Sequence, residues 1–188
     1  MQNVPMMPPP KQGMPTWLIA VLVIGGLVVV LIGTLGVLAI FGTRKYIAAA
    51  KGAEALNGVG QIARSAQAVY DPAHGPEALC TSASSPVPSS IASVTGKKYQ
   101  SAHPEWMVDS STNGGFACLG FEMTMPQYFQ YDYRLTGKGT DVGDEFHAIA
   151  RGDLDGDGVV SIYDLSGKIS GPDVVTIATT PTITNDGE

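Results

Sequence analysis

The chain contains 188 residues and carries a formal net charge of -6 at pH 7. This length is enough for one modest domain with an appended segment. The acidic balance, together with the lack of any lysine or arginine cluster, argues against nucleic-acid binding through a basic surface.

The chain opens with a proline-rich stretch, 1–15, which we interpret as a leader or a cytoplasmic tail. A run of 25 residues without a charged side chain follows, from Trp17 to Phe41. As a helix this run would be about 37 Å long, against a hydrocarbon core of about 30 Å. A domain of this size could hardly cover such a helix on all sides. No small-residue cleavage site follows the run, so we expect it to remain attached as a membrane anchor.

Helical spacing continues beyond the anchor as far as Tyr70. Asp71-Pro72 then ends the helix, because the residue before proline is pushed out of the helical region. We therefore predict one helix over 16–70, with Gly58 and Gly60 as local weak points. Residues recurring at steps of three and four are Ile47, Ala50 and Glu54, then Val59, Ile62, Ala66 and Val69.

The rest of the chain predicts an irregular region over 71–114, an antiparallel sheet over 115–180 and a polar tail over 181–188. Trp106 is expected to anchor the irregular region on the core. The alternation is clearest over 128–137, where Phe129, Tyr131, Tyr133 and Leu135 would share one face. The predicted strands are 115–124, 128–137, 145–151 and 159–167, with an edge strand within 174–184. The expected fold class is α+β, a long N-terminal helix packed on an antiparallel sheet.

The stretch GDLDGDGVVSIYD, 152–164, has the spacing of an EF-hand-type calcium loop. Two interpretations stay open. Without a cation the clustered carboxylates would repel one another, which favours a structural Ca²⁺. The residues after the loop favour a strand over a helix, however, and Asp-Gly steps also suit a plain hairpin turn. The candidate ligands are Asp153, Asp155 and Asp157, the carbonyl of Val159, Ser161 and Asp164, with Gly158 at the sharp turn.

Cys80 and Cys118 are the only cysteines. In an extracytoplasmic domain we expect them to form a disulfide, and the alternative is a pair of buried free thiols.

The sequence gives no sign of an enzyme. It has no glycine-rich phosphate loop, no nucleophile elbow and no histidine pair at metal-ligand spacing. His74 and His103 are interpreted as solvated loop residues, and His147 as an outward-facing residue of a strand that also carries Arg151. We therefore expect no catalytic residues.

Four stretches in this order resemble the bacterial type IV pilins and the pseudopilins of type II secretion: 44–71, 96–101, 115–133 and 146–167. The resemblance implies a long spine helix whose C-terminal half packs on an antiparallel sheet. It also implies an inner-membrane protein with a periplasmic head, whose helices bundle with those of other pilin-like subunits in a filament core.

The family's leader is cut by a prepilin peptidase after a glycine, with a glutamate at the fifth mature position. Gly13-Met14 offers the cleavage site, but the fifth position would be Leu18, so the glutamate is absent. The departure fits a minor subunit, an initiator or a chain that is never cut. The positive-inside rule alone would place the head in the cytoplasm, because Arg44 and Lys45 follow the anchor whereas Lys11 precedes it. The resemblance places the head outside.

The sequence therefore predicts a structural subunit of a pilus-like or pseudopilus-like filament. The alternative is an unprocessed, single-pass, membrane-anchored extracytoplasmic domain with a pilin-like fold that binds calcium or a partner. A docking module like the dockerins is the least favoured interpretation, because it would need a second aspartate loop.

Overall fold

The computed structural model describes residues 13, 15–71 and 77–186 and divides into two compact units, 1–44 and 45–188. The long helix α1, Thr16–Tyr70, contributes to both units and has 55 residues. Its bounds agree with the helix that the sequence predicts. The bond from the Leu18 N–H to the Pro15 carbonyl, 2.9 Å, belongs to its first turn.

The part of α1 in the first unit is apolar and exposed. The segment Thr16–Ala39 has a mean hydropathy of 3.0, and none of it is buried. By length and composition it can span a membrane, as the sequence predicts.

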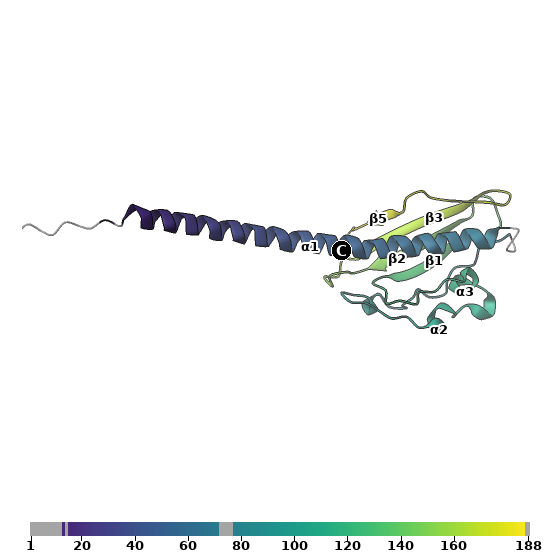
Figure 1. The fold of residues 1–188 in the computed structure, drawn as a ribbon. Coiled ribbons are helices and arrows are strands. Elements are labelled where there is room, and N and C mark those ends of the chain that lie inside the picture. The colour runs from purple at the N-terminus through teal and green to yellow at the C-terminus, as the bar shows by residue number, and fades with distance from the viewer. Residues whose placement is uncertain (1–12, 14, 72–76, 187–188) are drawn as a thin grey trace, which may run out of the picture. The chain divides into compact units, whose positions relative to one another are not determined.

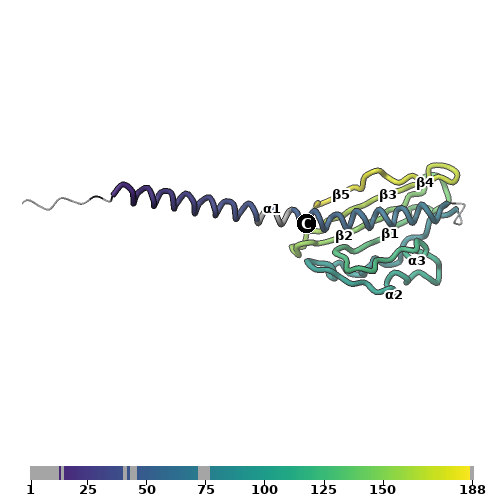
Figure 2. The backbone as a smooth tube through the Cα atoms, in the orientation of Figure 1, coloured from purple at the N-terminus to yellow at the C-terminus, as the bar shows by residue number. Residues whose placement is uncertain are grey.

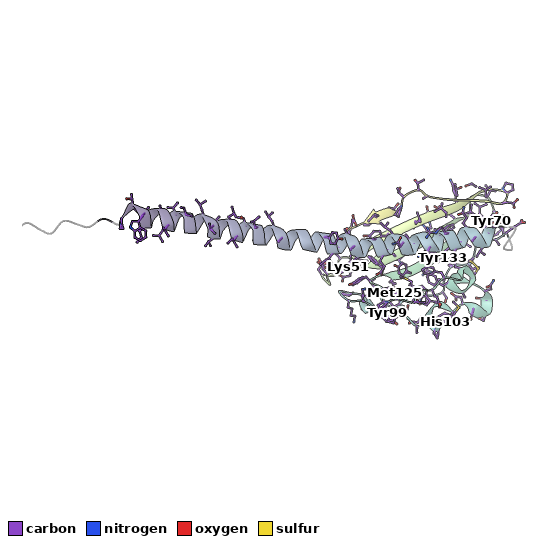
Figure 3. All side chains as sticks on the ribbon, in the orientation of Figure 1. Lys51, Tyr70, Tyr99, His103, Met125 and Tyr133 are labelled. Atoms are coloured by element: carbon purple, nitrogen blue, oxygen red, sulfur yellow. A yellow bond between two sulfur atoms is a disulfide. The ribbon has the colours of Figure 1, made fainter. Side chains whose placement is uncertain are left out.

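In the second unit, α1 lies along the sheet (Figure 1). It packs there through a narrow stripe of mostly small residues. Lys51 lies near one end of this part of the helix and Tyr70 at the other (Figure 3). The stripe begins later than the sequence pattern suggests, because Ile47 and Ala50 are exposed. Its buried residues are Gly52, Ala55, Gly58, Val59, Ile62, Ala63, Ala66 and Tyr70.

The sheet is antiparallel and is built from β1 (Gln130–Thr136), β2 (Glu145–Gly152), β3 (Ser161–Gly171), β4 (Val174–Ile177) and β5 (Thr182–Thr184). The first four strands pair in chain order, and β5 also pairs with β3. Both β4 and β5 lie beside β3 on the side away from β2 (Figure 2). The predicted edge strand within 174–184 is therefore two short strands.

One predicted strand is wrong. Residues Gly115–Leu119 form the short helix α3, and the first strand begins only at Gln130. Phe116 and Leu119 are buried three positions apart, which is helical spacing. Gly120 ends the helix in the left-handed conformation, with φ at 61°.

The region between α1 and the sheet carries short helical turns: η1 (Ile91–Ser93), α2 (His103–Trp106), η2 (Ser110–Thr112) and α3. Trp106 is 1% exposed and contacts Phe116 and Phe121 edge to face, with ring centroids 5.0 and 5.4 Å away. This confirms that Trp106 anchors the irregular region on the core.

The same region also forms hydrogen bonds with the edge of β1 that faces away from β2. The N–H of Ala83 donates to the Tyr133 carbonyl, and the N–H of Val87 donates to the Tyr131 carbonyl, both at 2.9 Å. Because this edge is paired, it is protected from pairing with another chain.

Candidate functional site

The exposed apolar part of α1 is the first candidate functional surface. Large side chains point outward along its length, among them Val29 at 70% and Leu38 at 67% exposed. Exposed apolar surfaces of this extent mark sites of contact with a membrane or with other proteins. Of the candidate processing site, Gly13 is described and exposed, whereas Met14 lies outside the described residues.

The second candidate site is the aspartate loop, which joins β2 to β3 between the paired residues Gly152 and Ser161. Carboxylate oxygens of Asp153, Asp155 and Asp157 all lie within 4.8 Å of one another. Asp153 is buried, and the other two are exposed. Among the described residues, the loop therefore gathers three carboxylates at one point, with the hard oxygen atoms that Ca²⁺ prefers.

Backbone N–H groups of the loop hold these carboxylates in place. Asp153 accepts from Gly156 at 2.7 Å and from Gly158 at 3.2 Å. Asp157 accepts from Val159 at 2.7 Å. The two glycines have φ of 85° and 95°, a conformation that residues with a Cβ rarely adopt. The glycines let the loop curl so that its acidic side chains converge.

The remaining predicted ligands are placed differently. Ser161 begins β3 and is fully buried. Asp164 also lies on β3, and its two carboxylate oxygens are 3.0 and 3.1 Å from Nδ1 of His147 on the neighbouring strand. The structure thus brings the first three aspartates together but does not bring Asp164 to them. The carboxylate at position 12 of the EF-hand pattern forms a cross-strand hydrogen bond with the His147 ring instead.

Two contacts connect the aspartate loop to distant parts of the chain. Nζ of Lys51 donates to the Leu154 carbonyl at 3.0 Å, and the N–H of Gly96 donates to the Asp153 carbonyl at 2.8 Å. Neither partner is expected from the sequence. Lys51 and Leu154 are 103 residues apart, so no local pattern could have indicated their contact.

Cys80 and Cys118 form a disulfide, as the sequence predicts. The bond connects helix α3 to the chain shortly before Ala83, which is hydrogen-bonded to β1. Cys80 is only 2% exposed.

Asp132 on β1 forms ion pairs with Arg134 on the same strand and with Arg151 on β2. Asp132 is 3% exposed, and its Oδ2 lies 2.9 Å from Nε of Arg134 and 3.3 Å from Nη1 of Arg151. These contacts pair one oxygen of the buried carboxylate, whereas Asp132 Oδ1 is buried without a hydrogen-bond partner among the described residues. Of the other histidines, His103 pairs with Glu122 at the surface, and His74 lies outside the described residues.

A scan against protein-family models found no matching model, and searches of curated proteins and of solved structures found no match.

Proposed function

We propose that the chain is a structural subunit of a type IV pilus-like or type II secretion pseudopilus-like filament, with no enzymatic activity. It assembles through its N-terminal hydrophobic helix. The observation that carries the proposal is that the two parts of α1 differ in their surroundings. Thr16–Ala39 is apolar with no buried residue, whereas the part from Ala55 onward supplies a face of the core.

Assembly follows because the exposed apolar part of α1 is more stable when lipid or another helix covers it. A helix of mean hydropathy 3.0 is stable in lipid or against other apolar helices. Four glycines along it leave open space beside the helix, since a Cβ added to any of them would have no neighbouring atom within 4 Å. A second helix can approach closely at these positions, which are Gly25, Gly26, Gly33 and Gly36. Helices from other pilin-like subunits are the partners of this surface.

We place the anchor in the bacterial inner membrane and the head outside the cytoplasm, in the periplasm or on a surface filament. The disulfide supports this side, because such bonds persist in oxidising compartments and are rare in the cytosol. The charge pattern opposes it, since Arg44 and Lys45 follow the anchor. The disulfide is the stronger argument. The positive-inside rule is a statistical preference, whereas a disulfide would be reduced in the cytosol.

The proposal is tested by identifying the first residue of the mature protein in its native host by mass spectrometry. Cleavage by a prepilin peptidase at Gly13 would leave a chain that begins with a methylated Met14 and that cross-links to other subunits. A Gly13→Leu variant should keep Met1 and lose both the methylation and the cross-links. An intact Met1 in the unaltered protein, with no filament association, would contradict the proposal.

A second candidate function is an unprocessed, single-pass, membrane-anchored extracytoplasmic domain that binds calcium or another partner. Two observations favour it. Leu18 stands where the filament family has glutamate, and the three carboxylates of the aspartate loop converge within 4.8 Å. In this case the chain keeps Met1, stays monomeric in the membrane and binds Ca²⁺. The bound ion would be structural, fastening the hairpin between β2 and β3.

A further inference from the structure

A small pocket separate from the aspartate loop lies where the head part of α1 begins. Its volume is about 290 Å³, which is at the lower limit for ligand pockets and suits a small group. It is lined by Tyr46, Ile47, Ala50, Lys51 and Glu54 of α1, together with Lys98 and Tyr128.

Two lysines converge on one aromatic ring in this pocket. Nζ of Lys51 and Nζ of Lys98 each lie 4.8 Å from the centroid of the Tyr128 ring. The two ammonium groups can therefore be no farther apart than twice that distance. Cation–π contact with the ring offsets part of their repulsion. An anion held by both ammonium groups would offset the rest of this repulsion.

Glu54 is the one carboxylate in the lining, and it is turned toward the backbone. Its Oε1 accepts the Tyr128 N–H at 2.6 Å. Burial raises the pKa of Glu54, while this hydrogen bond and the charge of Lys98 oppose the rise. With two lysines and one glutamate, the lining stays net positive even when Glu54 is ionised.

The outer part of the pocket is apolar and close to the anchor along the chain. Tyr46 is 78% exposed and Ile47 is 53% exposed. Tyr46 follows Phe41, the last residue of the uncharged run, by five residues. Five residues span at most about 18 Å, whatever their conformation. Exposed tyrosine and lysine beside an apolar span are typical of the membrane–water interface.

We propose that this pocket binds the phosphate of an anionic phospholipid headgroup. The proposal rests on the membrane anchoring in the proposed function, since the anchor supplies the lipid. Lys51 and Lys98 bind the phosphate oxygens, and Tyr46 and Ile47 lie against the glycerol and the upper acyl chains.

The test uses the full chain, first incorporated into lipid nanodiscs and then released into detergent for native mass spectrometry. Phosphatidylglycerol and phosphatidylcholine are added separately, and the retained lipid molecules are counted. We expect phosphatidylglycerol to be retained in preference. Lys98→Gln should weaken its binding about fivefold, the effect of one lysine at an anionic surface. Lys97→Gln makes the same charge change one residue away, outside the pocket lining, and should leave the binding unchanged.

Three results would overturn the headgroup site: equal effects of Lys97→Gln and Lys98→Gln, equal retention of both lipids, or Lys98-dependent binding of inorganic phosphate alone without lipid preference. The last result would indicate a site for free phosphate. A chain that does not enter nanodiscs at all contradicts the anchoring and with it the proposed function. A chain that enters without lipid preference contradicts only the headgroup site.

Discussion

Gly58 of α1 lies directly against the ring of Tyr131 on β1. A Cβ placed on Gly58 would be 2.3 Å from Cε1 of that ring, far inside van der Waals contact. Tyr131 is fully buried, and its hydroxyl donates to the Glu54 carbonyl at 3.3 Å, so the ring has little room to move. The glycine sets how closely the helix approaches the sheet.

We predict that Gly58→Ala lowers the free energy of unfolding of the head. The gain in helix propensity is about 1 kcal/mol, and it opposes an overpacking cost of about 1–3 kcal/mol. Because the clash is so short, we expect the overpacking cost to lie at the upper end of that range and to exceed the gain in helix propensity. Denaturant unfolding of the full chain in detergent, followed by tryptophan fluorescence, measures the change.

Gly60→Ala is the matched control. The nearest atom to a Cβ on Gly60 is Nη1 of Arg64 at 3.3 Å, at the end of a flexible side chain. The control should therefore be neutral or stabilising. Equal destabilisation by both substitutions would show that the Tyr131 contact is not the cause.

The second prediction concerns the disulfide between Cys80 and Cys118. The bridged residues are 38 positions apart. In the chain-entropy model, closing such a loop stabilises the fold by about 4 kcal/mol. Replacing both cysteines by serine should lower the melting temperature of the head, and reductant should do the same to the unaltered protein. Reductant should have no further effect on the double variant, and a melting temperature unmoved by either treatment would contradict the prediction.

The third prediction separates a calcium site from a plain turn. If the aspartate loop holds Ca²⁺, the ion stabilises the folded state by about 2.7 kcal/mol at a hundredfold excess over Kd. Chelation should then lower the melting temperature in calorimetry. Asp155→Asn should abolish the response to Ca²⁺ while leaving the apo protein equally or more stable, because Asp155 is exposed and the substitution removes a repelling charge.

Asp164→Asn is the control that the structure supplies for the calcium experiment. Asp164 contacts His147 instead of joining the three convergent carboxylates, so this variant should keep the calcium response. A lost response would mean that the loop rearranges around the ion to recruit Asp164. If neither calcium nor chelator moves the melting temperature of the unaltered protein, the loop is a turn alone.

Periodic segments are the part of the fold that the sequence predicts well. The helix over 16–70 and the strands near 130–136, 145–152 and 161–171 each bury residues at a regular period, so local pattern suffices. The segment 115–124 fails because its apolar residues alternate and also recur at three-residue steps. The segment forms a short helix that Gly120 ends in the left-handed conformation, and the apolar pattern alone does not show this end.

Contacts between distant parts of the chain are beyond the reach of local sequence patterns. Gln130 and Asp132 alternate with the core tyrosines, which predicts an outer face for them, yet both are buried. The region before β1 returns to cover them, as the bond from Gln130 Nε2 to the Pro88 carbonyl at 2.8 Å shows. Likewise, the sequence alone indicates only a weak point in the helix at Gly58, because the role of this glycine depends on an aromatic ring from a strand more than seventy residues later.

The last prediction concerns the loop between β1 and β2. Oδ2 of Asp144 accepts hydrogen bonds from the backbone N–H groups of Lys138, Gly139, Thr140 and Asp141, at 2.7 to 3.1 Å. The bond from Asp141 is the largest cause that holds the pKa of the Asp144 carboxyl below its ordinary value of 3.8. A Cβ on Gly137 would overlap this carboxylate, so the loop is built closely around it.

Because the folded-state pKa of Asp144 is depressed, its carboxylate stabilises the fold above the unfolded-state pKa, and this contribution is lost as pH falls through the folded-state value. Asp144→Asn should therefore lower the free energy of unfolding at neutral pH, and its deficit should shrink as the medium is acidified from about pH 6 to about pH 2. Asp141→Asn makes the same charge change on an exposed side chain that pairs only loosely with Lys138, at 3.6 Å. It should show little deficit at any pH. A constant deficit for Asp144→Asn across the range would assign its effect to the lost shape of the loop instead of the carboxylate charge.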